Sequence, residues 1–350
     1  MLPEVDLCLL RSNLRALAST PYFNQQVASY SEHLCSAIDH ALTEAPKLSE
    51  LSLRRLSETV WQAYQYLAGS ISSEAPYEVQ YCLEAALREW AKKDCLITTG
   101  FTYGPLAYHF NGLDPWKEVK ALVPSFSAQH FDRVLVLIGV PRLYRHKPIF
   151  CIPLFHELGH FVDRHVGVVA YIRLNALQQG GSFNQVTLPP LHWAEHFADL
   201  FAACYVGRSS TGLLEAVVPN APANQTHPAS KDRIDLVEKF VNGISDPRLT
   251  AFEIALKNLG APALKIRHTV PNLTSAYNDV RPVDIKSAAE LHGLFDAAWS
   301  YFSVNESKPV SPMTNVAMSV EQFERTVNDL TEKSIRNYST KEMWKAHAAP

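Results

Sequence analysis

The sequence predicts a predominantly helical α+β protein, and three observations support this fold class. Apolar residues recur every three or four positions through residues 1–93 and again through 246–350, which is the spacing of amphipathic helices. Short β-rich pieces occupy only residues 94–145, where the run from Val134 to Val140 is the best strand. A His-Glu-x-x-His motif follows at residues 156–160. We therefore expect a helical region at each end and a core at 94–245.

The flanking regions carry ordinary helix signals. Residues 53–67 and 79–90 predict two amphipathic helices in the N-terminal region. Residues 249–259 predict another in the C-terminal region, where capping boxes at Ser287 and Ser319 start two more. No chemistry shows in the N-terminal region, and the C-terminal helices are expected to pack on the core.

Composition and charge exclude several classes of protein. The chain has 350 residues, of which 47% are hydrophobic and 19% charged, with a net charge of −3, so nothing favours nucleic acid or an anionic membrane as partner. The acidic start from Met1 to Asp6 does not resemble a signal peptide, and no apolar run approaches the roughly 18 residues of a membrane span. The six cysteines include no Cys-x-x-Cys pair. These features predict a cytoplasmic protein with reduced cysteines and no membrane insertion.

The motif at His156, Glu157 and His160 predicts a metal site. On a helix, residues four apart differ by only about 40° in azimuth, so both imidazoles leave one face and can bind one ion. This spacing is typical of Zn²⁺ bound by two histidines, with the glutamate as general base. Pro153 can start the helix and Gly167 can stop it.

A second helix, starting at Pro189 and Pro190, offers the missing metal ligand. Glu195 and Asp199 are four residues apart among mostly apolar positions, where two acids are costly without a cation. We therefore predict Glu195 as the third ligand and Asp199 as the carboxylate that holds the distal N–H of a ligand histidine. The alternative is that both acids face solvent.

Three other side chains compete for a place at the metal. Asp163 lies one turn beyond His160 and could be a ligand or an orienting group. His192 and His196 flank Glu195 but lie on other faces of the helix, so they are expected to be surface or satisfied histidines.

The order of three motifs, over about residues 133–240, resembles the gluzincin zinc metallopeptidases. These motifs are His156-Glu157-Leu158-Gly159-His160, then Glu195 with Ala198-Asp199, then His227-Pro228 with Arg233-Ile234. The pattern is most similar to the HtpX-like and CAAX-processing endopeptidases and their soluble minimal relatives. The chain lacks the hydrophobic spans of the membrane-embedded members, so their membrane location and prenyl-peptide substrates are not carried over.

The resemblance implies a zincin-like core with a small β-sheet beside the helix of the first motif. It also implies that His156, His160 and Glu195 bind zinc, that Glu157 is the base and that Asp199 supports a ligand. His227 either donates to the oxyanion of the reaction or makes a plain contact at a helix N-terminus. Tyr205 is a weaker candidate for the oxyanion donor, and Arg233 is expected to be structural.

The predicted function is zinc-dependent hydrolysis of peptide bonds in a peptide or protein substrate. One alternative is a non-catalytic, regulatory protein of the same fold that binds a partner through its terminal helices, and another is a zinc hydrolase of a non-peptide amide.

For the strand at 134–140, two interpretations stay open. It could be an edge strand that pairs with an extended substrate, or an ordinary buried strand.

Overall fold

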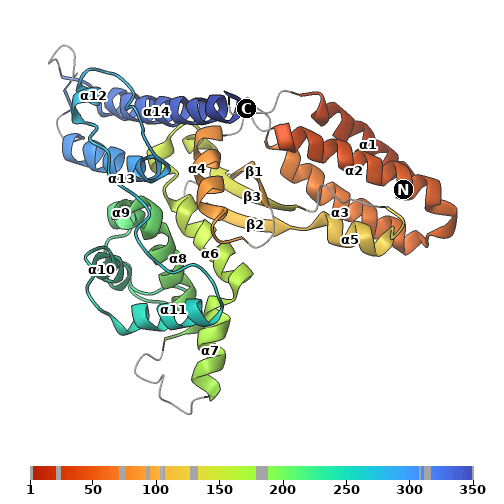
Figure 1. The fold of residues 1–350 in the computed structure, drawn as a ribbon, viewed down its shortest axis with the longest axis horizontal. Coiled ribbons are helices and arrows are strands. Elements are labelled where there is room, and N and C mark those ends of the chain that lie inside the picture. The colour runs from red at the N-terminus through yellow and green to blue at the C-terminus, as the bar shows by residue number, and fades with distance from the viewer. Residues whose placement is uncertain are drawn as a thin grey trace. The chain divides into compact units, whose positions relative to one another are not determined.

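The computed structural model describes residues 3–20, 25–70, 76–91, 95–102, 104, 107–126, 133–178, 188–306, 309–310 and 317–348. It is mostly helical with one small sheet, as predicted (Figure 1). Its contacts divide the chain into two compact units. Unit 1 contains residues 1–80 and 91–145, and unit 2 contains 81–90 and 146–350. The predicted boundaries at residues 93 and 245 stay predictions.

Unit 1 combines helices with the sheet. Its helices are α1 (Pro3–Ala18), α2 (Gln25–Glu44), α3 (Glu50–Ala68) and α5 (Pro115–Leu122), with 3₁₀ turns at Ala45–Lys47 and Arg142–Tyr144. The long helices α1, α2 and α3 pack on one another through leucines spaced by three and four, such as Leu7, Leu10 and Leu14. Ser49 caps α3 by accepting the N–H of Ser52.

The sheet has three strands in the order β1 (Cys95–Thr102), β3 (Val134–Pro141) and β2 (His109–Leu113). Strand β3 pairs parallel to β1 and antiparallel to β2. The strand predicted at 134–140 is therefore the central strand, and the edge-strand reading was wrong. Its continuous apolar run suits a strand that is buried over most of its length.

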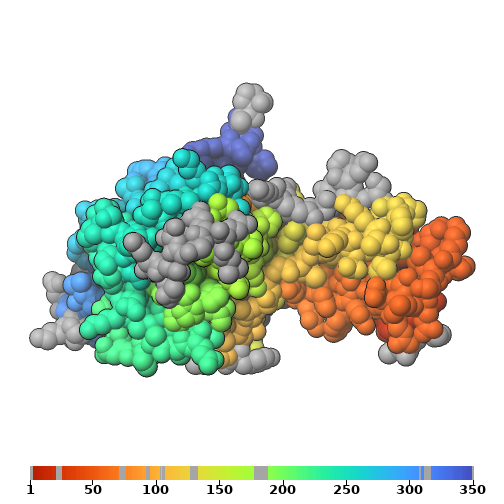
Figure 2. Space-filling model, turned by 90° about the horizontal axis from the view of Figure 1, so that it is seen from below, coloured from red at the N-terminus to blue at the C-terminus, as the bar shows by residue number. Residues whose placement is uncertain are grey.

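Unit 2 consists of helices joined by loops, and none of the named strands lies among its described residues. Its described residues contain the larger part of α4 (Tyr77–Leu87), a 3₁₀ turn at Pro148–Phe150, and nine further helices. These are α6 (Pro153–Val166), α7 (Val168–Gln178), α8 (Pro190–Val206), α9 (Ser209–Val217), α10 (Ser230–Val241), α11 (Pro247–Asn258), α12 (Thr274–Asn278), α13 (Ala288–Asn305) and α14 (Val320–Ala348). The segments coloured lime to teal, which include α6 to α11, gather on one face of unit 2 (Figure 2).

Predicted start and stop signals act as expected in unit 2. Helix α6 begins at Pro153 and ends at Gly167, whose left-handed φ of 84° suits glycine. Ser287 caps α13 through the N–H of Glu290. Ser319 and Gln322 form a complete capping box at α14, since each side chain accepts the other residue's N–H.

Two further predictions concern the sheet and the cysteines. The sheet belongs to unit 1 and α6 to unit 2, so the placement of the sheet beside α6 stays a prediction. All six cysteines are free thiols, and four are buried, as expected for reduced core residues. Within the described residues, no helix is both long and apolar enough to cross a membrane.

Candidate metal centre

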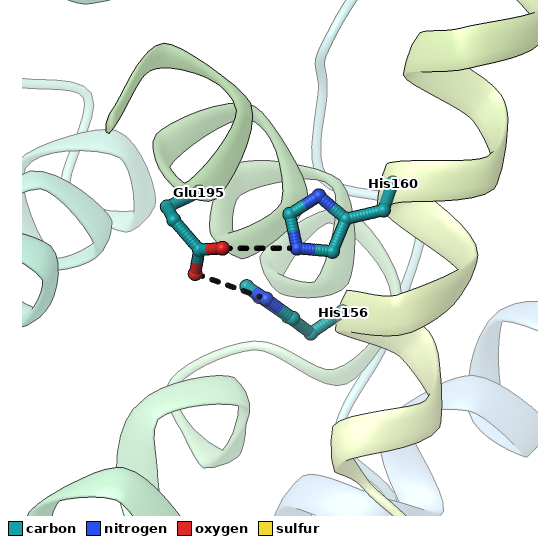
Figure 3. Close-up of side chains that lie close together, drawn as sticks. All are labelled: His156, His160 and Glu195. Atoms are coloured by element: carbon teal, nitrogen blue, oxygen red, sulfur yellow. Dashed lines mark ion pairs between the residues drawn. The ribbon is translucent and has the colours of Figure 1, made fainter. Parts of the chain in front are cut away.

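Helices α6 and α8 of unit 2 bring the three predicted ligands together. His156 and His160 leave one face of α6 and meet Glu195 of α8 (Figure 3). His156 Nε2 lies 3.4 Å from Glu195 Oε2, and His160 Nε2 lies 3.2 Å from Glu195 Oε1. The ligand atoms of all three residues lie within 4.8 Å of one another. Separations near 3.3 Å suit ligands that share one ion at about 2.0–2.2 Å.

The close approach of the two helices depends on small residues at the crossing. A Cβ atom on Gly159 would lie 2.7 Å from the Cα of Ala198 and 3.1 Å from its carbonyl oxygen. Gly159 lies between the two histidines of the first motif, and Ala198 lies next to Asp199 in the second. The glycine therefore sets the distance between the helices, and with it the distance from Glu195 to the histidines.

We expect Gly159→Val to push α8 away from α6 and weaken zinc binding by at least about tenfold, because the added side chain meets backbone rather than flexible atoms. Zinc affinity can be measured by competition with a chromogenic chelator. Ala170→Val is the control, since Ala170 is an exposed position on the neighbouring helix α7. Unchanged zinc affinity in Gly159→Val would contradict this role.

Asp199 lies directly behind His156. The Nδ1–H of His156 donates to Asp199 Oδ1 at 2.8 Å, which leaves Nε2 facing Glu195. The hydrogen bond therefore sets the orientation of the ring that a metal ligand needs. Asp199 is only 2% exposed, so this carboxylate does not face solvent. The alternative of two solvent-facing acids was wrong.

Arg233 of α10 completes the buried charge network. Its Nε and Nη2 donate to the two oxygens of Asp199, each at 2.7 Å, and its Nη1 lies 3.3 Å from Glu195 Oε2. Sequence reasoning expected a structural arginine, whereas the structure joins it to both carboxylates. The sequence feature that could have indicated this role is the spacing between Arg233 and the His227-Pro228 pair in the third motif.

These contacts shift the pKa values of the acids and of the histidine. Burial alone would raise the pKa of Glu195 and of Asp199, but their cationic neighbours lower both well below the ordinary range. Burial alone would lower the pKa of His156, whereas the charge and the hydrogen bond of Asp199 raise it to about 9. The two carboxylates are therefore ionised at neutral pH, and the metal-free site holds a proton on His156.

Zinc affinity should therefore rise with pH. A metal and a proton compete for Nε2 of His156, so below a pKa of about 9 each pH unit upward should increase the affinity roughly tenfold for this one proton. Zinc titrations at pH 6, 7 and 8 check the slope. Asp199→Asn removes the charge that raises the pKa, so its slope should flatten within this range. A wild-type affinity that does not change with pH would contradict the proton-bound site.

The residues present fit a metal ion. Glu195 Oε2 is a buried oxygen of an ionised carboxylate, and it accepts no hydrogen bond although Arg233 Nη1 and His156 Nε2 lie 3.3 and 3.4 Å away. A buried oxygen without a hydrogen bond is costly, and a metal ion between it and the histidines would satisfy it. Two imidazole nitrogens and a carboxylate also form a donor set that zinc accepts in catalytic sites.

His227 lies at the rim of this group. Its Nε2 is 3.6 Å from Glu195 Oε1, and its side chain is 52% exposed. The turn that presents it is held by Asn224, whose Oδ1 accepts the N–H groups of Thr226 and His227, each at 2.8 Å. Helix α10 begins at Ser230, three residues beyond His227. His227 is thus fixed by the turn and not by the helix.

The remaining candidates lie outside the group. Asp163 accepts the N–H of Val169 at 2.8 Å and so caps α7. His192 is buried and its Nε2 donates to the carbonyl of Asn224 at 2.7 Å, so it is a satisfied histidine that anchors the turn before His227. His196 is also buried, not on the surface, and burial lowers its pKa to about 4.

Tyr205 takes no part in the metal centre. Its hydroxyl accepts the Nε1–H of Trp90 at 2.9 Å and donates to the carbonyl of Ala86 at 3.2 Å. Both partners lie in the core of unit 2, where the tyrosine is buried. Its use as the oxyanion donor would need these bonds to be broken, and we do not assign it that role.

Comparison with known proteins adds no further assignment. No protein-family model, no curated protein and no solved structure matches this chain. The case for the site therefore rests on its residues and their geometry.

Proposed function

We propose that the chain is a zinc-dependent peptidase of the gluzincin type. The observation that carries this proposal is the meeting of His156, His160 and Glu195 from two helices, with a buried oxygen of Glu195 that accepts no hydrogen bond among them. Zinc held by these residues would lower the pKa of a bound water and polarise the carbonyl of a peptide. The zincin-like core and the identity of the metal are parts of the same proposal.

The residues of the chain take distinct roles in the proposed reaction. Glu157 is the general base that accepts a proton at its carboxylate and later passes it to the leaving amine. It sits on α6 between the two histidines, half-buried, and its charge reaches Arg233. Asp199 orients His156, and Arg233 holds Asp199 in place.

His227 is proposed to meet the substrate. Its ring is half exposed and lies next to Glu195, so a carbonyl oxygen that enters the site can reach it. An N–H on Nε2 of His227 can donate to the negative charge developing on that oxygen. The ordered turn from Asn224 to His227 holds the ring before the substrate arrives.

A peptide library is the direct test of this function. The protein, loaded with zinc, is incubated with a mixture of synthetic peptides, and new termini are identified by mass spectrometry. Cleavage should stop after removal of the metal by a chelator and return when zinc is added back. Absence of cleavage, together with hydrolysis of small non-peptide amides, would favour the other hydrolase reading.

A further inference from the structure

Two exposed features of the chain lie outside the metal centre and complement each other. One is a groove between α1 and α3 of unit 1, with a volume of about 370 Å³. The other is the last part of α14 in unit 2, from Lys341 to Ala348, which is called the free end of the helix below. Neither feature belongs to the proposed reaction, and each presents an exposed tryptophan.

The α1–α3 groove is apolar in the middle and acidic at its sides. Leu9 and Trp61 line it and remain 54% and 47% exposed, while Asp6 and Glu58 bring carboxylates to the same groove. The two helices are neighbours in the N-terminal bundle (Figure 1). A partly exposed tryptophan beside unpaired acids suits a partner with apolar and cationic side chains.

Several basic side chains on the helices of the groove bind other acids. Arg11 and Arg15 of α1 both bind Asp39 of α2, and Arg54 of α3 binds Glu50 on its own helix. Over the described residues, neither Asp6 nor Glu58 forms an ion pair with a basic side chain. The carboxylates of Asp6 and Glu58 are therefore available to a cationic partner.

The free end of α14 has the opposite character. The helix is packed as far as Ser339, but every side chain from Met343 to Ala348 is exposed, including Trp344 at 72%. Lys341, Trp344 and Lys345 are spaced by three and four and so share one helix face. Among the described residues, Lys341 pairs with the exposed Asp284 and Lys345 with the half-exposed Glu342, and such surface pairs contribute little and can be exchanged.

We propose that the free end of α14 from a second copy of the chain docks in the α1–α3 groove. Trp344 of one copy packs against Leu9 and Trp61 of the other, and Lys341 and Lys345 approach Asp6 and Glu58. This is a helix-in-groove contact, in which an aromatic anchor supplies affinity and the charges supply orientation. The contact is small, so the association is reversible, and it does not depend on the metal.

Sedimentation velocity over a range of concentrations tests the proposal with the full-length protein. The wild type should self-associate, and the association should weaken as salt screens the charges. Trp61→Ala and Trp344→Ala should each raise the dissociation constant about 10- to 30-fold, since each removes an aromatic anchor. Leu174→Ala is the matched control because Leu174 is a 60% exposed apolar side chain on α7, outside both features.

Mixing the two tryptophan variants gives a second, independent measurement. One variant keeps an intact groove and the other an intact helix end, so the mixture should form a complex that neither forms alone. Circular dichroism of each variant checks that the fold is kept. The proposal is overturned if the wild type stays monomeric up to several hundred micromolar, if association survives both substitutions, or if only one of the two weakens it.

Discussion

Glu157→Gln should retain zinc and lose hydrolysis by several orders of magnitude. The substitution keeps the size of the side chain and leaves His156, His160 and Glu195 unchanged, so the metal-binding group stays complete. An amide cannot accept the proton that the proposed reaction must remove, because it lacks the basic carboxylate. Zinc content by mass spectrometry and cleavage of a peptide found in the library screen measure the two effects separately.

The control for this substitution is Glu253→Gln, because Glu253 is an exposed acid on α11 and not among the residues of the metal centre. It should keep both zinc and activity. Activity in Glu157→Gln close to that of the wild type would remove Glu157 from the reaction. Loss of zinc in the same variant would instead show that Glu157 acts on the metal site itself.

The same variant separates the peptidase from a regulatory protein of the same fold. A protein that acts only by binding a partner has no need of a base beside its metal, so Glu157→Gln would leave its biological effect intact. A peptidase would lose its effect while keeping its fold and its zinc. The proposed self-association gives a further readout, because it lies outside the metal centre and should persist in Glu157→Gln.

The helices were predictable because their signals are local. Periodic apolar residues, Pro153 and Gly167 at the ends of α6, and the capping boxes at Ser287 and Ser319 act over a few residues, within one turn or two. The meeting of His156, His160 and Glu195 was predictable for a related reason. Buried acids four residues apart need a cation, and the two histidines of α6 supply a place for one.

Other features depend on contacts between segments far apart in the chain. The central position of β3 follows from strand pairing, which a run of apolar residues does not specify. Arg233 is in contact with Asp199, 34 positions earlier, and the residues around each of them do not predict that contact. The turn that presents His227 likewise depends on His192 of α8, whose sequence neighbours gave no sign of such a bond.

Glu195→Ala should largely abolish zinc binding. Glu195 is one of the three proposed ligands and places a negative charge at the centre of the group, next to both histidines and to Arg233. Without it, the arginine faces the metal position with no carboxylate between them, and the remaining pair of histidines has neither the donor number nor the charge that zinc needs. Zinc titration followed by chelator competition measures the loss.

Asp199→Asn should have a smaller effect, because Asp199 acts on zinc only through His156. The asparagine can still accept the Nδ1–H of His156 with its oxygen, but its NH₂ group then opposes the donors of Arg233. The loss of an orienting carboxylate of this kind typically costs about 10- to 100-fold in affinity or activity. Asp199→Asn should therefore bind zinc at saturating metal and hydrolyse peptides poorly.

The contrast between these two substitutions tests whether Glu195 is a metal ligand and Asp199 is the carboxylate that orients His156. His165→Ala is the control, since this exposed histidine lies on α6 beyond the group and should leave zinc affinity unchanged. The assignment fails if Glu195→Ala keeps its zinc while Asp199→Asn loses it, because Asp199 would then be the metal ligand. It fails equally if His192→Ala or His196→Ala removes zinc from a protein that remains folded, since α8 would then present a different face to the histidines of α6.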